Sequence, residues 1–83
     1  MNISVLSPER EIFSGEITSV KVPGTTGQFE VLQNHAPIVA ALTEGSIRIK
    51  KANGETLKFD IKKGFIEVLY NQISLLVQVT ESN

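Results

Sequence analysis

The sequence contains no cysteine and no tryptophan, and its only histidine is His35. Without cysteine the chain can form no disulfide, no zinc site with thiolate ligands and no cysteine nucleophile. Metal centres commonly use several His, Cys or clustered carboxylate ligands, but the 9 acidic residues are scattered singly along the chain. We therefore expect no metal centre and no cofactor.

The chain also lacks an excess of positive charge and any long apolar run. Its formal net charge is -1 and its sequence pI is about 5.7, whereas nucleic-acid binding needs clustered lysine and arginine. No stretch is long and apolar enough to span a bilayer, and residues 1–11 resemble no signal peptide. We expect a protein of a reducing, cytosol-facing compartment that binds no nucleic acid.

The length of 83 residues predicts a single domain over residues 1–83 with a thin core. A chain of this size buries only about 60–65% of the surface of its unfolded form. Small domains without disulfides or metals often depend on a partner for part of their stability.

The main periodic signal is the alternation of apolar and polar residues. Ile47 and Ile49 alternate with polar residues before Asn53–Gly54, and Leu57 and Phe59 do so after it. Alternation indicates strands with one face in water, and Asn-Gly favours a type I′ turn, so residues 45–61 are predicted to form a hairpin.

Turn residues recur between short apolar segments, and no window has a helical period. The pattern predicts an all-β fold, a two-layer antiparallel β-sandwich of about nine to ten short strands. The expected strands cover residues 3–6, 11–13, 15–22, 28–31, 38–42, 45–50, 55–61, 64–70 and 72–79.

Three of these strands, residues 38–42, 64–70 and 72–79, are apolar on both faces. A two-layer sandwich covers one face of each strand, so the other would form the kind of apolar patch that marks a partner surface. The alternative is a closed or bent sheet in which the domain covers both faces. Glu67 interrupts the face of Phe65 and Leu69, and it either protects a sheet edge or pairs with a cation of a partner.

No recognised catalytic motif is present. The stretch Gly24–Thr25–Thr26–Gly27 lacks the Lys-Ser/Thr of a phosphate-binding loop and is predicted to be a flexible turn, the longest polar one. His35 lies in residues 33–37, where Asn34 tolerates a left-handed backbone and Pro37 favours extended geometry before it. We expect the imidazole to hydrogen-bond this corner or to cap the edge of an interface, and the chain not to be an enzyme by itself.

Two other classes of function have weaker support. A lipoyl- or biotinyl-type carrier needs a modified lysine on a tight turn, and Lys62–Lys63–Gly64 lacks the usual Asp-Lys or Met-Lys-Met setting. A generic ligand-binding β-domain, for sugars as an example, would favour exposed aromatics, and the 4 Phe and 1 Tyr fall mostly on core faces.

The spacing G-x-F-x-V-L-x-x-H-A-P-[IL]-V-x-x-L-x-x-G over residues 27–45 resembles the epsilon subunit of F-type ATP synthases, called delta in mitochondria. Four further segments match in order: SPEREIFSGE at 7–16, VPGTTG at 22–27, GSIRI at 45–49 and GFIEV at 64–68. The resemblance implies the N-terminal β-sandwich of a non-catalytic central-stalk (rotor) subunit. Such a subunit docks gamma onto the c-ring and couples ion-driven rotation to ATP synthesis.

The resemblance also implies two contact regions. The gamma-facing interface would comprise His35, Ala36, Pro37, Ile38, Val39 and Ala41. The c-ring-facing loop would comprise Thr25, Thr26, Gly27, Gln28 and Glu30. Relatives often have an acidic residue at Gln28 and proline–glycine at Gln33–Asn34, so any charge pairing by Gln28 does not carry over.

Many members of the family continue into a C-terminal helical hairpin that inhibits ATP hydrolysis and in some cases binds ATP. This sequence ends at residues 80–83, where that hairpin would begin. We expect a naturally short form without the hairpin and without nucleotide binding. The resemblance implies a peripheral location on the cytoplasmic face of the inner (plasma) membrane.

Overall fold

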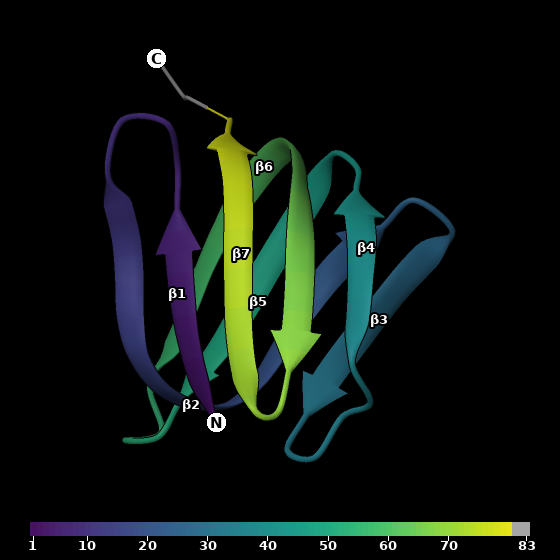
Figure 1. Cartoon of the computed structure of the whole chain (residues 1–83). Helices are drawn as coiled ribbons and strands as arrows, with labels where there is room; N and C mark the ends of the chain where they lie inside the picture. The colour runs from purple at the N-terminus through teal and green to yellow at the C-terminus, as the bar shows by residue number, and fades with distance from the viewer. Residues whose placement is uncertain (81–83) are drawn as a thin grey trace.

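The computed structural model describes residues 1–80, which form seven β-strands and no helix. The predicted all-β class is therefore confirmed, and the described part of the chain contains no helical membrane span. The expected end without a helical hairpin falls mainly on residues 81–83, outside the described residues. The strands, shown in Figure 1, are β1 (Asn2–Leu6), β2 (Glu11–Gly24), β3 (Gly27–Leu32), β4 (Ile38–Leu42), β5 (Gly45–Lys51), β6 (Thr56–Leu69) and β7 (Gln72–Val79).

Strands β2 and β6 each run through both layers of the sandwich. The first half of β2 pairs with β1, and its second half pairs with β5 and β3. The first half of β6 pairs with β5, and its second half pairs with β7 and β4. The two long strands thus join a layer containing β1, β7 and β4 to a layer containing β5 and β3, as Figure 1 shows. The register shifts between Ile61 and Lys63, where β6 changes layer, and such bulges bend a strand.

Two details of the predicted sandwich are wrong. Seven strands are present instead of about nine to ten, because the expected breaks at Ser14 and at Lys62–Lys63 lie inside continuous strands. The sheet is also not wholly antiparallel, since β1 and β7 run parallel with Ile3 opposite Ile73. Local sequence patterns cannot show a pairing between the two ends of a chain.

The bend in β6 brings its backbone very close to β7. A Cβ added to Gly64 would lie 2.5 Å from the carbonyl oxygen of Leu76 and 3.0 Å from Cγ1 of Val77. Real Cβ atoms do not approach backbone oxygen so closely, so this position needs glycine.

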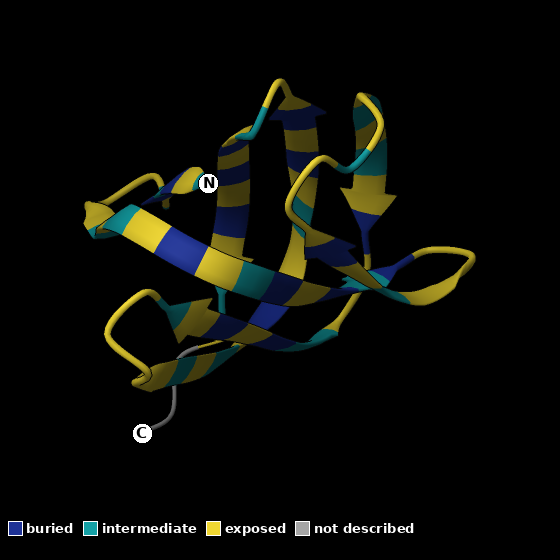
Figure 2. Cartoon of the chain, turned by 90° about the horizontal axis from the view of Figure 1, so that it is seen from below, coloured by how far each residue is buried: buried dark blue, intermediate teal, exposed yellow. Residues whose placement is uncertain are grey.

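The core between the layers is aliphatic. Buried and exposed residues alternate along the strands, as Figure 2 shows, and no polar or charged residue within residues 1–80 is buried. Burying each large aliphatic side chain contributes about 1.5–3 kcal/mol. The buried hydrophobic residues are Ile3, Val5, Ile17, Val20, Val22, Val31, Leu42, Ile47, Ile49, Ile61, Ile66, Val68, Ile73, Leu75 and Val77.

The predicted hairpin over residues 45–61 is confirmed, but its turn is not type I′. Gly54 has a φ of 93°, whereas Asn53 is not among the residues with positive φ. The amide of Gly54 donates to the carbonyl of Lys51 (3.0 Å), which leaves a longer connection with glycine in the left-handed position. Asn53 instead stabilises the loop through its side chain, whose Oδ1 accepts from the amide of Glu55 (2.9 Å).

Candidate docking surface

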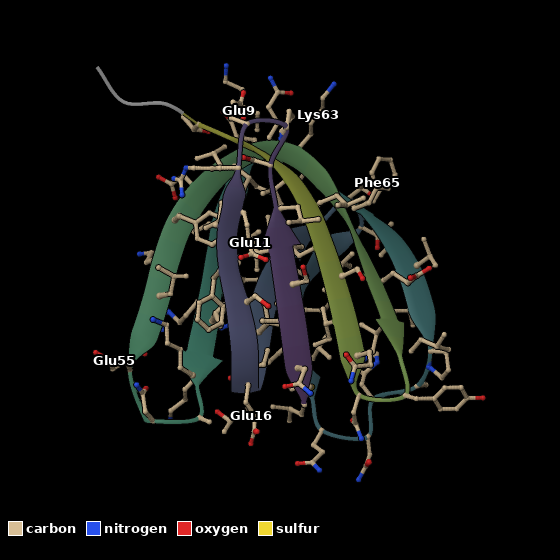
Figure 3. The ribbon with its side chains drawn as sticks, turned by 60° about the vertical axis from the view of Figure 1, so that its left-hand side comes forward. Glu9, Glu11, Glu16, Glu55, Lys63 and Phe65 are labelled. Atoms are coloured by element: carbon tan, nitrogen blue, oxygen red, sulfur yellow. The ribbon has the colours of Figure 1, made fainter. Side chains whose placement is uncertain are left out.

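One outer surface of the sandwich carries large apolar side chains on neighbouring strands. Phe65 of β6 lies between Ala41 of β4 and Leu76 of β7. Phe65 is 59% exposed and Leu76 is 52% exposed, and Figure 3 shows the ring of Phe65 projecting from the ribbon. A contiguous exposed patch of this kind marks an interaction site. We call the following residues the outer apolar face: Leu6, Val39, Ala41, Phe65, Leu69 and Leu76.

This surface resolves the two alternatives for the strands that are apolar on both faces. The sheet does bend and close through β2 and β6, as the second alternative expected. Closure nevertheless leaves one side of β4, β6 and β7 uncovered, since Val39 is 72% exposed. The outward-pointing side chains of these strands are therefore available to a partner.

An open groove of about 650 Å³ runs beside the outer apolar face. Its lining includes Leu6, Phe65 and Leu76 together with Pro8 from the β1–β2 loop. Lys63 is the charged member of the lining. A largely apolar, open groove suits an apolar segment of another protein better than a small charged substrate.

Glu67 lies inside the outer apolar face, opposite Val39 on one side and Ser74 on the other. Because β6 is flanked here by β4 and β7, Glu67 is not on an edge strand. The hypothesis that it protects a sheet edge is therefore wrong. Pairing with a cation of a partner remains as the functional hypothesis.

The His35 corner, residues 33–37, connects β3 to β4 beside this surface. The amide of His35 donates to the carbonyl of Leu32 (3.2 Å), and Asn34 has a φ of 66°. Nδ1 of His35 lies 2.7 Å from the carbonyl oxygen of Ala36, so the predicted hydrogen bond within the corner is present. Ala36 and Pro37 are exposed, which leaves an apolar ridge in front of the strand.

The structure places the predicted gamma-facing residues on two sides of β4. Val39 and Ala41 point outward with Ala36 and Pro37 exposed beside them. Ile38 is half-buried and packs against the core, because it shares the parity of the buried Leu42. Leu6, Phe65 and Leu76 were not among the interface residues predicted from the sequence. Phe65 and Leu76 could have been found, because both lie in strands that are apolar on both faces.

The predicted c-ring loop is a tight turn rather than a long flexible one. Thr25 and Thr26 connect Gly24 to Gly27, which lie opposite each other in the β2–β3 hairpin. The amide of Thr25 donates to the carbonyl of Ala41 (3.2 Å), which ties the turn to β4. Figure 1 shows this turn at the end of the molecule opposite the His35 corner. Gln28 and Glu30 follow on the exposed parity of β3.

The described residues do not assemble a catalytic centre. No group of three or more His, Cys, Asp or Glu within residues 1–80 could hold a metal ion. Ser46 donates to Asp60 (2.6 Å), but the pair is exposed and has no histidine beside it. Lys62 and Lys63 lie within β6 and not on a hairpin turn, which contradicts the carrier hypothesis.

Comparison with known families agrees with this architecture. Residues 1–83 match the family described as "ATP synthase, Delta/Epsilon chain, beta-sandwich domain". The chain belongs to this family. Membership confirms the resemblance to the epsilon subunit of ATP synthases.

Several curated relatives are ATP synthase epsilon chains. The chain is 48% identical over 77 residues to that of Leptospira borgpetersenii, covering 92% of this chain and 59% of the relative. It is 43% identical over 79 residues to that of Caulobacter vibrioides, covering 94% of this chain and 90% of the relative. The chain thus spans less than two thirds of the Leptospira relative's length.

Two solved structures of ATP synthases contain chains of similar fold. A chain of the Euglena gracilis mitochondrial ATP synthase aligns with a TM-score of 0.83 at 18% identity, covering 90% of this chain and 48% of that one. A chain from the central stalk and c-ring of the Tetrahymena thermophila enzyme aligns with a TM-score of 0.80 at 13% identity, covering 94% and 63%. At these identities the likeness shows the shared fold alone.

Proposed function

We propose that this domain docks the gamma chain of an F-type ATP synthase onto the c-ring and couples ion-driven rotation of the ring to ATP synthesis. The observation that carries the proposal is the outer apolar face, an exposed patch on a domain of the delta/epsilon family. The domain contributes contacts and no chemistry. It needs no cofactor and binds no nucleotide through residues 1–80.

The gamma chain binds along the outer apolar face and the His35 corner. Val39, Phe65 and Leu76 supply apolar area that water covers in the free domain. Covering it is favourable at about 25 cal/mol per Å². The carboxylate of Glu67, central in this face, pairs with a cation of gamma.

The c-ring binds at the end of the domain away from the His35 corner, through the turn at Thr25 and Thr26. A short turn with hydroxyl side chains and a glycine with φ 136° suits contact with polar loops. Gln28 and Glu30, on the exposed parity of β3, extend this polar surface. The two partners thus bind different surfaces that meet near Ala41, whose carbonyl accepts from the amide of Thr25, and the domain lies peripherally on the cytoplasmic face of the inner (plasma) membrane.

The test is co-purification with the gamma chain of the same enzyme, followed by mapping of amides that gamma protects from exchange. Val39→Asp should weaken complex formation by about 100-fold or more, because burying an unpaired carboxylate in an apolar contact costs about 3 kcal/mol or more. Thr56→Asp places the same side chain on an exposed position of the other layer and should leave binding unchanged. Unchanged gamma affinity in both Val39→Asp and His35→Ala would refute the placement.

A further inference from the structure

Two asparagines in separate turns are joined by two hydrogen bonds, one from a backbone N–H and one between their side chains. The amide N–H of Asn34 donates to Oδ1 of Asn71 (2.7 Å), and Nδ2 of Asn71 donates to Oδ1 of Asn34 (3.2 Å). The residues are 37 positions apart in the sequence, one in the His35 corner and the other in the β6–β7 turn. A reciprocal pair of this kind fixes the distance and the orientation between the two turns.

The contacts of the His35 corner explain why this pair matters. The bonds from His35 to Leu32 and to Ala36 are local and do not fix the corner relative to the domain. The two bonds to Asn71 reach across to another strand pair. Ala36 and Pro37 are exposed, so packing contributes little to holding this segment.

The β6–β7 turn adopts an unusual backbone that places Asn71 for this contact. Tyr70 and Asn71 have φ values of 50° and 61°, the two left-handed residues of a type I′ turn. A bulky residue such as Tyr70 rarely adopts this conformation. The carbonyl of Asn71 also accepts from the amide of Asn2 (3.0 Å), so the turn is anchored to β1 while its amide side chain holds the corner.

The turn and the corner together enclose one depression on the surface. A pocket of about 320 Å³ is lined by residues 34–37 and by Tyr70 and Asn71. Tyr70 is 82% exposed at its rim, beside the ridge of Ala36 and Pro37. The amide pair therefore sets the shape of a surface that continues the proposed gamma-binding region.

We propose that Asn71 is a positioning residue for gamma binding, acting by holding the His35 corner through its amide pair with Asn34. The inference rests on the proposed function and adds the β6–β7 turn to the same site. It implies that the corner binds gamma in the conformation that the free domain already has.

Three variants test the role of the side chain. Asn71→Gly keeps a residue that tolerates positive φ and removes the amide group. Asn71→Asp keeps the acceptor for the backbone N–H of Asn34, and the side-chain amide of Asn34 can turn so that its Nδ2 donates to the carboxylate. Asn53→Gly is the matched control, because the side chain of Asn53 bonds within its own loop, to Glu55.

Affinity for the gamma chain and amide exchange of the free domain are measured for each variant. Asn71→Gly should bind gamma about five- to tenfold more weakly, as expected for the loss of about one to two hydrogen bonds. Its Asn34 and His35 amides should exchange faster while the β5 amides do not, a pattern that general destabilisation would not give. Asn71→Asp should recover most of the affinity, and Asn53→Gly should bind like wild type.

The result separates two kinds of failure. If wild type binds gamma and Asn71→Gly binds within twofold of it, the positioning role is wrong and the proposed function stands. If wild type does not bind gamma at all, the proposed function fails, and this inference fails with it.

A double variant, Asn34→Gly with Asn71→Gly, should bind no more weakly than Asn71→Gly alone, because the two side chains act as one unit.

Discussion

Phe65 of β6 lies directly opposite Leu76 of β7, and both side chains point away from the core. The residues next to them, Ile66 and Leu75, also lie opposite each other and are fully buried. One register therefore sets both the core and the outer apolar face. A slip of one residue would exchange the two faces, so the same pairing that stabilises the fold also presents the docking surface.

Adjacent leucines in β7 should separate stability from binding. Leu75→Ala removes a side chain with no exposed area and should cost about 2–5 kcal/mol of unfolding free energy. Leu76→Ala should cost about 1 kcal/mol or less, because that side chain is already half in water. Urea unfolding measures both values.

Affinity for gamma should depend on the exposed leucine, Leu76. Leu76→Ala should weaken the complex with gamma several-fold, measured by calorimetry on folded protein. Unaltered gamma affinity in Leu76→Ala, combined with normal stability, would argue against the outer apolar face as the docking surface.

Two glycines in the long strands should respond differently to alanine. Gly64→Ala should lower the unfolding free energy by about 1–3 kcal/mol, because its Cβ would collide with backbone of β7. Gly15→Ala should be near neutral, since its Cβ would meet the tip of the Phe13 ring at 3.1 Å, which can move. Denaturant unfolding under identical conditions compares them, and equal effects would contradict the close approach of β6 to β7 at Gly64.

The left-handed backbone of Tyr70 predicts a stabilising substitution. Tyr70→Asn should raise the unfolding free energy by about 0.5–1 kcal/mol, because asparagine adopts positive φ more readily than a bulky residue. Gln72→Asn is the control, since Gln72 lies in the extended strand β7 and should gain nothing. Thermal unfolding followed by circular dichroism measures the difference. A loss of stability in Tyr70→Asn would mean that the ring makes contacts worth more than the strain.

The c-ring end should respond to charge independently of gamma. Glu30→Arg reverses an exposed charge on β3, the strand that follows the Thr25–Thr26 turn, and should weaken attachment to the membrane sector, with gamma affinity unchanged. Glu55→Arg makes the same change in the β5–β6 loop and serves as the control. Reconstituted proton pumping and gamma binding are measured in parallel. Loss of gamma binding in Glu30→Arg would place the two partners on one surface, contrary to the proposal.

Much of the fold could be predicted because its signals are local. Alternation across residues 45–61 identified a hairpin, and the apolar runs identified β4 and β7. The turn types were less predictable: the Asn53–Gly54 loop is longer than the expected type I′ turn, and the type I′ turn occurs at Tyr70–Asn71. The strand register fixes the length of each loop, and it outweighs the preference of particular residues for a turn type.

The candidate site was predictable only in part. Val39, Ala41 and the corner around His35 were expected at a surface, and they lie at one. Ile38 was grouped with them but faces the core, because alternation along β4 outweighs proximity in sequence. Leu6 could not be found in advance, since only the parallel pairing of β1 with β7 brings it beside Leu76.

The sequence by itself determined that the chain forms strands, that its family is the delta/epsilon family, and that no cysteine chemistry is available. Those properties depend on residue types and on spacings within a few positions. Tertiary structure alone decided which apolar parity remained exposed, how β2 and β6 bend to close the sandwich, and that Asn34 meets Asn71. These depend on pairings between residues far apart in the chain, which are selected by burial of the whole core and leave no periodic trace in the sequence.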